Sequence, residues 1–423
     1  MDSRHIRRFS VNEVSEVTMI PPPRRRAVLL FGHAGFAYGH VSRCRKIARR
    51  LVEQFPLDAY VVSSCPEYEP EEEHEAIHEV LLPPFRIGSP DSLPERLPIP
   101  NRASSLAHVP VDQLSAHRGR LLLALATHIE PHAVLLEGFP FIRPLQAVEE
   151  CGPTLAYLSQ HSPRTLRCAG FNGVATSLWM GEHASLVERT LREQLDRLFV
   201  YVDPAERTGL LERSPWLQTI AAKVHVTGYV VGAPPEKADA PLQILATFGS
   251  GVDAFRKIVL VVEAFFAFVA SEPGFSLHLV TGGQLTDRGY REIARLVDGR
   301  ADVRLSRVVP GLARRLNHYR LVISMGGYNA CTELYQASTR GLVLPRFAPD
   351  FGEQMEQARK FQKAGAIEHL VDAEATSPGS LAALITRTLT MPPSPRLPID
   401  IGGAEAAARS LAGAPPPRPA RPA

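Results

Sequence analysis

The sequence has 423 residues, of which 45% are hydrophobic and 22% charged, and its formal net charge is +3. This length predicts two or three domains, and the apolar content is sufficient for a large buried core. The small net charge argues against a dedicated nucleic-acid binder, which usually presents a concentrated basic face.

Arginines gather locally at residues 24–26 and 49–50. Such short runs are usually solvated patches, and the alternative is a peripheral contact with an anionic membrane. The sequence shows no apolar stretch of about 18 residues and no apolar core of a secretory signal at its start. Its five cysteines are widely spaced, which favours neither a disulfide framework nor a zinc knuckle. We therefore expect a cytoplasmic protein.

The first half of the chain predicts an α/β domain. Residues 1–23 are polar and end in three prolines, which predicts a flexible lead-in. An apolar run at 27–31, a helical spacing of apolar residues at 41–55 and a second apolar run at 59–62 predict a β-loop-α-β opening. Residues 66–120 are rich in Pro, Glu and Arg and predict long irregular loops. The further predicted strands are residues 133–136, 154–158 and 198–202.

The second half repeats this alternation after a Gly- and Pro-rich linker at 232–241. Its predicted strands are residues 244–248, 277–281, 302–305, 321–324 and 341–344. The pattern predicts two Rossmann-like, doubly wound α/β domains, 24–231 and 242–400, which face a cleft. Residues 412–423 are mostly Pro, Ala and Arg and predict a disordered tail.

The strongest functional motif lies in the second predicted domain. A strand ends at Ser324, two glycines follow at Gly326 and Gly327, and a helix begins. Free backbone N–H groups and the helix dipole at such a turn favour a phosphate. Glu333, about two turns into that helix, is then suited to accept hydrogen bonds from a ribose diol. The alternative is an ordinary strand-to-helix turn with Glu333 as a solvated helix residue.

This motif, together with residues 344–346, 352–358 and 363–366, resembles the donor half of the GT-B glycosyltransferases. The resemblance is to the N-acetylglucosaminyltransferase family that makes peptidoglycan lipid intermediates, and to related bacterial predicted glycosyltransferases. It implies that Glu333 holds the donor ribose. It also implies two glycine loops for the diphosphate and a pair of residues for the sugar hydroxyls: Gly249, Ser250, Gly251, Gly326, Gly327, Tyr328, Asn329, Glu353 and Gln354. From its position alone, Arg346 is expected to add positive charge near the leaving diphosphate.

The first predicted domain resembles the same family at its opening glycine loop, which ends in Gly39 and His40. In inverting relatives the matching histidine is the general base, which makes His40 the candidate base, and an imidazole titrates near working pH. Glu137, which stands where some relatives have Asp, is the candidate carboxylate that orients it. The alternative is that His40 shapes the cleft or touches phosphate. The acceptor-side candidates are His33, which is also a second candidate base, Gly39 and Arg43.

Residues 74–78 fit the H-E-x-x-H pattern, which binds zinc when it lies on a helix. No long amphipathic helix surrounds this segment and no third ligand is evident, so we predict a solvated acidic loop instead. No D-x-D stands in a strand-end loop either. The sequence therefore predicts neither a metal nor a cofactor.

Taken together, the resemblance implies an inverting, metal-independent glycosyltransferase that uses a UDP- or dTDP-sugar and a small-molecule acceptor. A secondary metabolite and a cell-envelope intermediate are both open as acceptors, as are an oxygen or a nitrogen nucleophile and the oligomeric state. Helix 401–411 is expected to cross back to the first domain, as in that family. The alternatives are a nucleotide-sugar 2-epimerase or hydrolase of the same fold, and a catalytically idle sugar-nucleotide-binding partner protein.

Overall fold

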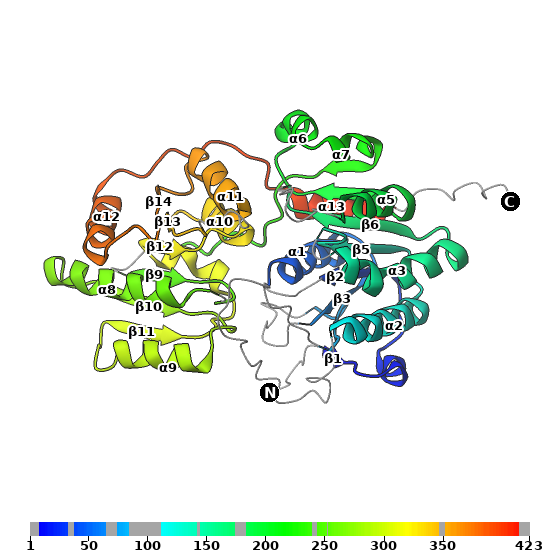
Figure 1. The fold of residues 1–423 in the computed structure, drawn as a ribbon, viewed down its shortest axis with the longest axis horizontal. Helices are drawn as coiled ribbons and strands as arrows, with labels where there is room; N and C mark the ends of the chain where they lie inside the picture. The colour runs from blue at the N-terminus through cyan, green and yellow to red at the C-terminus, as the bar shows by residue number, and fades with distance from the viewer. Residues whose placement is uncertain are drawn as a thin grey trace. The chain divides into compact units, whose positions relative to one another are not determined.

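The computed structural model describes residues 8–32, 38–64, 74–83, 111–141, 144–173, 183–238, 243–251, 253–346 and 352–413. These residues form two compact units (Figure 1). The first unit runs to Val231 and resumes at Asp400, and the second unit runs from Gly232 to Ile399.

In its described part, the first unit is built on a sheet of eight parallel strands, in the order β1-β4-β3-β2-β5-β6-β7-β8. The strands are β1 Arg8–Ser10, β2 Arg26–Gly32, β3 Leu57–Ser63, β4 Ile77–Leu81, β5 Ala133–Glu137, β6 Leu166–Phe171, β7 Arg197–Val200 and β8 Val224–Val226. The central strands β2 and β5 are continuous apolar runs because helices cover both faces of the sheet. The chain reverses its direction of travel across the sheet between β2 and β5, which makes this pair the topological switch point.

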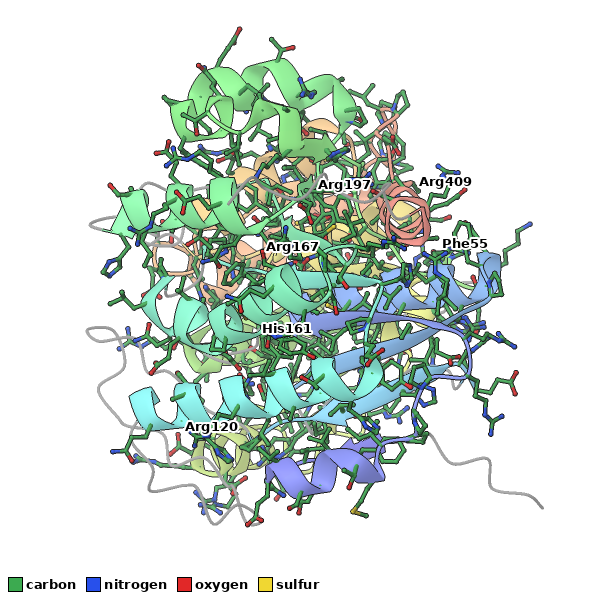
Figure 2. The ribbon with its side chains drawn as sticks, turned by 90° about the vertical axis from the view of Figure 1, so that its right-hand side faces the viewer. Phe55, Arg120, His161, Arg167, Arg197 and Arg409 are labelled. Atoms are coloured by element: carbon green, nitrogen blue, oxygen red, sulfur yellow. The ribbon has the colours of Figure 1, made fainter. Side chains whose placement is uncertain are left out.

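Helices of the first unit lie on opposite faces of this sheet. The connection through α1 moves outward from β2, whereas those through α2 and α3 move in the other direction, and right-handed crossovers put them on opposite faces. Figure 2 looks onto the face of α2 and α3, where Arg120 and His161 are labelled. The helices are α1 Gly39–Gln54, α2 Val111–Ile129, α3 Pro144–His161, α5 Ala184–Gln194, α6 Arg207–Arg213, α7 Pro215–Gln218 and α13 Gly403–Ala412.

The last helix, α13, packs against α1 of the first unit, although it follows the whole second unit in sequence (Figures 1 and 2). Its buried face is made of alanines and Leu411. His132 lies 3.0 Å from the carbonyl oxygen of Leu411, and the guanidinium of Arg197 donates to the hydroxyl of Ser410 at 2.5 Å. The chain therefore returns to the first unit and closes it with polar bonds as well as apolar contacts.

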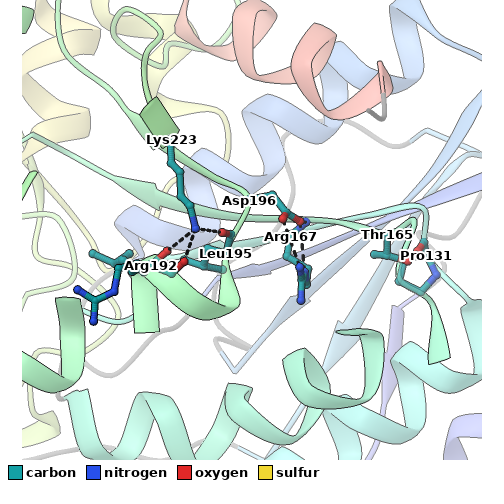
Figure 3. A network of polar contacts seen from close by, with 8 residues as sticks. Pro131, Thr165, Arg167, Arg192, Leu195, Asp196 and Lys223 are labelled. Carbon is teal, nitrogen blue, oxygen red and sulfur yellow. Dashed lines mark hydrogen bonds and ion pairs between the residues drawn. The ribbon is translucent and has the colours of Figure 1, made fainter. Parts of the chain in front are cut away.

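Charged side chains make polar contacts near the end of α5, beside strands β6, β7 and β8 of the same sheet (Figure 3). The ammonium group of Lys223 donates to the carbonyl oxygens of Leu195 at 2.7 Å and of Arg192, which lie at the helix terminus. Helix C-termini leave such carbonyls without partners inside the helix. Beside it, Arg167 on β6 makes a paired contact with Asp196, with N–O distances of 3.2 Å. These bonds fix the approach of the chain to β7.

The described part of the second unit holds a sheet of six parallel strands in the order β11-β10-β9-β12-β13-β14. Counted within the unit, this is the 3-2-1-4-5-6 order of a Rossmann sheet, with its switch point between β9 and β12. The strands are β9 Gln243–Thr247, β10 Ser276–Val280, β11 Val303–Ser306, β12 Leu321–Ser324, β13 Arg340–Val343 and β14 His369–Leu370. The helices are α8 Phe255–Ser271, α9 Asp287–Leu296, α10 Tyr328–Gln336, α11 Gly352–Lys363 and α12 Pro378–Thr390.

The prediction of two Rossmann-like, doubly wound domains is confirmed, and nine of the predicted strands are present with ends shifted by at most two residues. The buried residues of these strands end at the carboxyl edge of each sheet, and the candidate site residues lie at that edge. The predicted tail from residue 414 onward lies outside the described residues.

Two predictions for the first half of the chain are wrong where the structure describes the residues. Residues 8–10 form the edge strand β1 beside β4, and the side chains of Val11, Val17 and Ile20 are buried, so this part of the lead-in belongs to the core. Its apolar residues are too sparse for a strand or helix pattern, and only the tertiary contacts reveal their role. In the segment predicted as irregular loops, β4 lies at Ile77–Leu81 and α2 begins at Val111.

The strand predicted at 154–158 is also wrong, because these residues belong to α3. The buried residues Ala147, Cys151, Leu155 and Leu158 recur at helical spacing, which a window of five apolar residues conceals. The strand of this region is β6, whose apolar run is interrupted by Arg167. That arginine is tolerated because it pairs with Asp196.

Candidate functional site

In the first unit, three candidate residues meet at the switch point between β2 and β5. Glu137 is the last residue of β5, and α1, which follows β2, carries His40 and Arg43 in its first turns. Because ligands of doubly wound sheets bind outside the carboxyl ends of the strands at this point, the cluster is the candidate site of the unit. His33 lies outside the described residues.

The carboxylate of Glu137 is the centre of this cluster and is fully buried. Its Oε1 accepts from Nε of Arg43 at 2.6 Å and lies 3.3 Å from Nδ1 of His40. Its Oε2 accepts from the hydroxyl of Tyr201 at 2.8 Å. The His40 side chain is 17% exposed, so the imidazole is the member of the cluster that faces outward. Arg43, predicted on the acceptor side, directs its guanidinium to Glu137, and 3% of its side chain is exposed.

Electrostatics keep the Glu137 carboxyl ionised. Burial by itself raises its pKa, but the charge of the Arg43 guanidinium, with the neighbouring His40 ring, outweighs burial and lowers the pKa to about 2. Burial, and then the neighbouring Glu137 charge, raise the pKa of Tyr201 well above its ordinary value. At neutral pH the cluster therefore holds a carboxylate that accepts from a neutral phenol and a guanidinium.

The lowered pKa of Glu137 predicts an acid-sensitive contribution to folding. A carboxyl whose pKa is depressed in the folded state stabilises it above the unfolded pKa of 4.5, and this stability is lost as pH falls toward about 2. The loss is on the order of 3 kcal/mol. We expect the difference in free energy of unfolding between the wild type and Glu137→Gln to shrink by this amount between about pH 5 and pH 2. Urea denaturation across that range measures it, and a difference that does not change with pH contradicts the assignment.

Sequence reasoning missed Tyr201, which directly follows β7. Its position in the sequence could have identified it, because a polar side chain at the carboxyl end of a buried strand lies on the edge of the sheet where ligands bind. Gly170 on β6 makes room for it, because a Cβ there would lie 1.9 Å from Oε2 of Glu137 and 2.4 Å from the Tyr201 hydroxyl. The cluster is thus built from α1, β5, β6 and the end of β7.

In the second unit, two glycine loops follow the neighbouring strands β9 and β12 at the other switch point. Gly251 has a φ of +87°, and a Cβ there would lie 2.6 Å from the carbonyl oxygen of Thr281, so only glycine fits. Gly326 has a φ of +70°, and a Cβ there would lie 2.5 Å from Val343. The backbone of Ser250 accepts from the N–H of Gln284 at 2.7 Å. These contacts hold both loops close to the sheet edge.

Helix α10 begins directly after these glycines. Gly327 precedes its first residue, Tyr328, and a Cβ at Gly327 would meet nothing within 4 Å, so the approach to the helix start is open among the described residues. Asn329 lies in the first turn and Glu333 in the second, both partly buried. The backbone N–H groups and the dipole at a helix start of this kind suit a phosphate.

Positive charge gathers on the same edge of the second unit. Arg346 lies just beyond β13, and NH2 of its guanidinium is 3.2 Å from the carboxylate of Asp253 in the loop after β9. The backbone N–H of Arg346 donates to Oε1 of Gln354 at 3.3 Å. Lys257, missed by sequence reasoning, is buried in the first turn of α8, and burial, followed by the Arg346 charge, lowers its pKa. The side chain of Glu353 lies outside the described residues. The structure thus brings Arg346 and Gln354 to the edge that carries the glycine loops.

The H-E-x-x-H segment forms no helix, and the predicted solvated loop is wrong for Ile77 and His78, which begin β4. His78 lies in the buried strand β4 and stacks on Tyr60, with ring centroids 4.7 Å apart. Glu79 pairs with Arg45 at 2.5 Å. Within the described ranges, no three His, Cys, Asp or Glu side chains are grouped to hold a metal ion. Among the helices that the structure describes, none is long and apolar enough to cross a membrane.

Comparison with known proteins agrees with this architecture. Residues 248–401 match the model of the glycosyltransferase family 28 C-terminal domain, and this range includes both glycine loops and Glu333. No curated protein matches the sequence of the chain.

Two solved structures with TM-scores of 0.54 share the fold at low sequence identity. UDP-GlcNAc 2-epimerase from Methanocaldococcus jannaschii is 12% identical with a TM-score of 0.54, over 91% of this chain and 99% of that one. UDP-GlcNAc 2-epimerase from Neisseria meningitidis, bound to UDP-GlcNAc, is 13% identical with a TM-score of 0.54, over 91% and 98%. MurG from Acinetobacter baumannii is 14% identical with a TM-score of 0.47, over 92% and 99%.

The matched range includes the two loops that the fold brings to the switch point of the second unit. The chain is therefore a two-unit α/β protein whose residues 248–401 match a glycosyltransferase family 28 C-terminal domain.

Proposed function

We propose that this protein transfers a sugar from a UDP- or dTDP-sugar to a small-molecule acceptor, without a metal ion and with inversion at the anomeric carbon. The observation that carries the proposal is the match of residues 248–401 to the family 28 C-terminal domain, with the two glycine loops of that range at one switch point. A secondary metabolite is the acceptor class we favour, in an intracellular reaction.

On the donor side, each proposed role follows from charge and geometry. The diphosphate lies at the start of α10, where backbone N–H groups and the helix dipole stabilise the negative charge that grows on the leaving group. Glu333 accepts hydrogen bonds from the ribose hydroxyls. Arg346 supplies positive charge at the same sheet edge, and Glu353 and Gln354 contact the hydroxyls of the sugar.

On the acceptor side, His40 is the proposed general base. The acceptor oxygen or nitrogen attacks the anomeric carbon as its proton passes to Nε2 of His40, and the bond from that carbon to the diphosphate breaks, with the electron pair leaving on the diphosphate. The ionised carboxylate of Glu137, 3.3 Å from Nδ1, favours the imidazolium that forms. This role requires the neutral imidazole to carry its proton on Nδ1 before the reaction.

A nucleotide-sugar 2-epimerase or hydrolase and an idle sugar-nucleotide binder are the competing functions. An epimerase changes the configuration of the donor sugar, a hydrolase releases sugar without an acceptor, and a binder shows affinity without turnover. Following the donor sugar by NMR, with and without a panel of acceptors, separates these outcomes. Inverted product that appears only with an acceptor supports the transferase.

The donor site is tested by isothermal titration with UDP, dTDP and GDP. We expect one of the first two nucleotides to bind with a micromolar Kd, and Glu333→Ala to weaken this binding by about tenfold or more, since hydrogen bonds to a charged group contribute about 1.5–3 kcal/mol. Glu263→Ala, on an exposed position of α8, is the matched control and should bind as the wild type does. Binding of none of the nucleotides, or affinity indifferent to Glu333, would refute the donor site.

A further inference from the structure

Two groups with opposite requirements contact one nitrogen of His40. Nδ1 lies 2.9 Å from NH2 of Arg43 and 3.3 Å from Oε1 of Glu137. A carboxylate oxygen only accepts hydrogen bonds, and a guanidinium nitrogen only donates them. A single ring nitrogen of a neutral imidazole is either a donor or an acceptor, so it cannot satisfy both neighbours at once.

The distances decide between the two neighbours. At 2.9 Å, the Arg43 contact has the usual length of an N–H donor to its acceptor, whereas 3.3 Å to Glu137 is longer than the usual range. A hydrogen on Nδ1 would also point at the N–H groups of a permanently charged guanidinium. Oε1 is already well bonded, because Nε of Arg43 donates to it at 2.6 Å. The geometry therefore favours Nδ1 as an acceptor from Arg43.

We propose that Arg43 is a positioning residue that holds the resting imidazole of His40 with its proton on Nε2, so that NH2 of Arg43 must leave Nδ1 before His40 acts as a base. The inference that this controls catalysis rests on the proposed function of His40. The tautomer itself does not, because it follows from the contacts of Nδ1 alone.

Arg43 is suited to such a movement because its two contacts use different nitrogens. Nε holds Oε1 of Glu137, and NH2 meets Nδ1 of His40. Rotation about the last side-chain bonds shifts NH2 while the charge of the guanidinium stays beside the carboxylate. The proton then moves from Nε2 to Nδ1 through solvent exchange, Nδ1–H donates to Oε1, and the lone pair of Nε2 becomes available to take the acceptor proton.

The experiment is a long-range ¹H–¹⁵N correlation spectrum of the full chain with ¹⁵N-labelled histidine, at about pH 8, above the ordinary imidazole pKa of about 6.5. His40→Gln assigns the His40 signals by their loss. We expect Nδ1 in the unprotonated range and Nε2 in the protonated range, with a ratio of at least about tenfold between the tautomers. A spectrum with Nδ1 protonated in the wild type overturns the proposal without any further variant.

Arg43→Met gives the second arm, because methionine keeps the bulk of the side chain and removes both donors. We expect the tautomer ratio to reverse, with Nδ1 protonated and donating to Glu137. Arg49→Met is the matched control and should leave the ratio unchanged, because Arg49 is a partly exposed residue of the same helix and pairs with Glu53. Circular dichroism checks that both variants fold, and an unchanged tautomer in a folded Arg43→Met also overturns the proposal.

The NMR experiment and the nucleotide titration distinguish failure of this proposal from failure of the proposed function. If nucleotide binding is absent but Nε2 carries the proton, the donor site is wrong and the contact of Arg43 with His40 stands. If UDP or dTDP binds through Glu333 but Nδ1 carries the proton, the donor site stands and Arg43 has no control over His40.

Discussion

Replacing Glu137 with glutamine is expected to lower kcat by about 10²- to 10⁴-fold, the range for removing a general base or the group that sets its tautomer. The amide keeps the size of the side chain but removes the negative charge that Arg43 and His40 share. In the proposed reaction, the amide no longer stabilises the imidazolium that forms as the acceptor proton arrives. Nucleotide affinity should stay within about twofold, because the proposed donor residues belong to the second unit.

The matched control is Glu79→Gln. Glu79 is also a buried carboxylate of the first sheet, and it also pairs with an arginine of α1, Arg45, at 2.5 Å. It lies on β4, away from the switch point, so we expect a change in stability and little change in kcat. Steady-state kinetics with the donor and an accepted acceptor measures both variants. Equal losses of kcat in the two would mean that burial of a charge, rather than its place beside His40, causes the effect.

The pairing of His40 with Glu137 was predictable because both lie next to strands whose order the βα alternation implies. Glu137 ends one apolar run, and His40 opens the helix after another. Since these runs are neighbours in a doubly wound sheet, their carboxyl ends meet. The glycine loops after β9 and β12 follow from the same argument in the second unit.

The contacts around that pair were not predictable in the same way. Tyr201 lies 64 residues from Glu137 in sequence, and its hydroxyl reaches the carboxylate only because Gly170 on the strand between them has no side chain. Arg43 stands one turn from His40 on α1, but the sequence does not say whether its guanidinium turns to solvent or to Glu137. Side-chain direction depends on packing from elements far along the chain, which periodicity does not encode.

The misassigned elements show the same limit. Residues 154–158 are an apolar run that suits a strand, yet they continue a helix whose buried side is set by contact with α2. Strand β6 contains Arg167, whose charge argues against a buried strand until Asp196 is seen beside it. In both cases tertiary contacts override the local pattern.

Replacing Gly170 with alanine is expected to destabilise the first unit by about 2–4 kcal/mol, because the new methyl group has no space. Its Cβ would lie 1.9 Å from Oε2 of Glu137 and 2.4 Å from the hydroxyl of Tyr201, well inside van der Waals contact. Either the buried carboxylate moves away from Arg43 or the tyrosine loses its bond to Oε2. Both outcomes leave a buried polar group without its partner.

Urea denaturation followed by tryptophan fluorescence measures this loss. Both tryptophans of the chain, Trp179 and Trp216, precede the unit boundary at Val231 in sequence, so the signal is assigned to the first unit. Gly152→Ala is the matched control, because Gly152 lies within α3 and its new Cβ would meet only Val148, at 3.7 Å. Because Pro153 follows directly and a Cβ before a proline disfavours the helical backbone, this alanine is expected to change stability by less than about 1 kcal/mol.

The two glycine variants separate crowding at the cluster from a general effect of adding a methyl group. If Gly170→Ala is as stable as the wild type, the Glu137–Tyr201 pair is not held against β6, and the cluster is looser than its contacts imply. If the variant is destabilised, Tyr201→Phe in the same background should restore part of the loss, because it removes the hydroxyl that lies 2.4 Å from the new methyl group. The remainder reports the contact with Glu137 itself, and kcat should stay low in the double variant because the carboxylate is still displaced from His40 and Arg43.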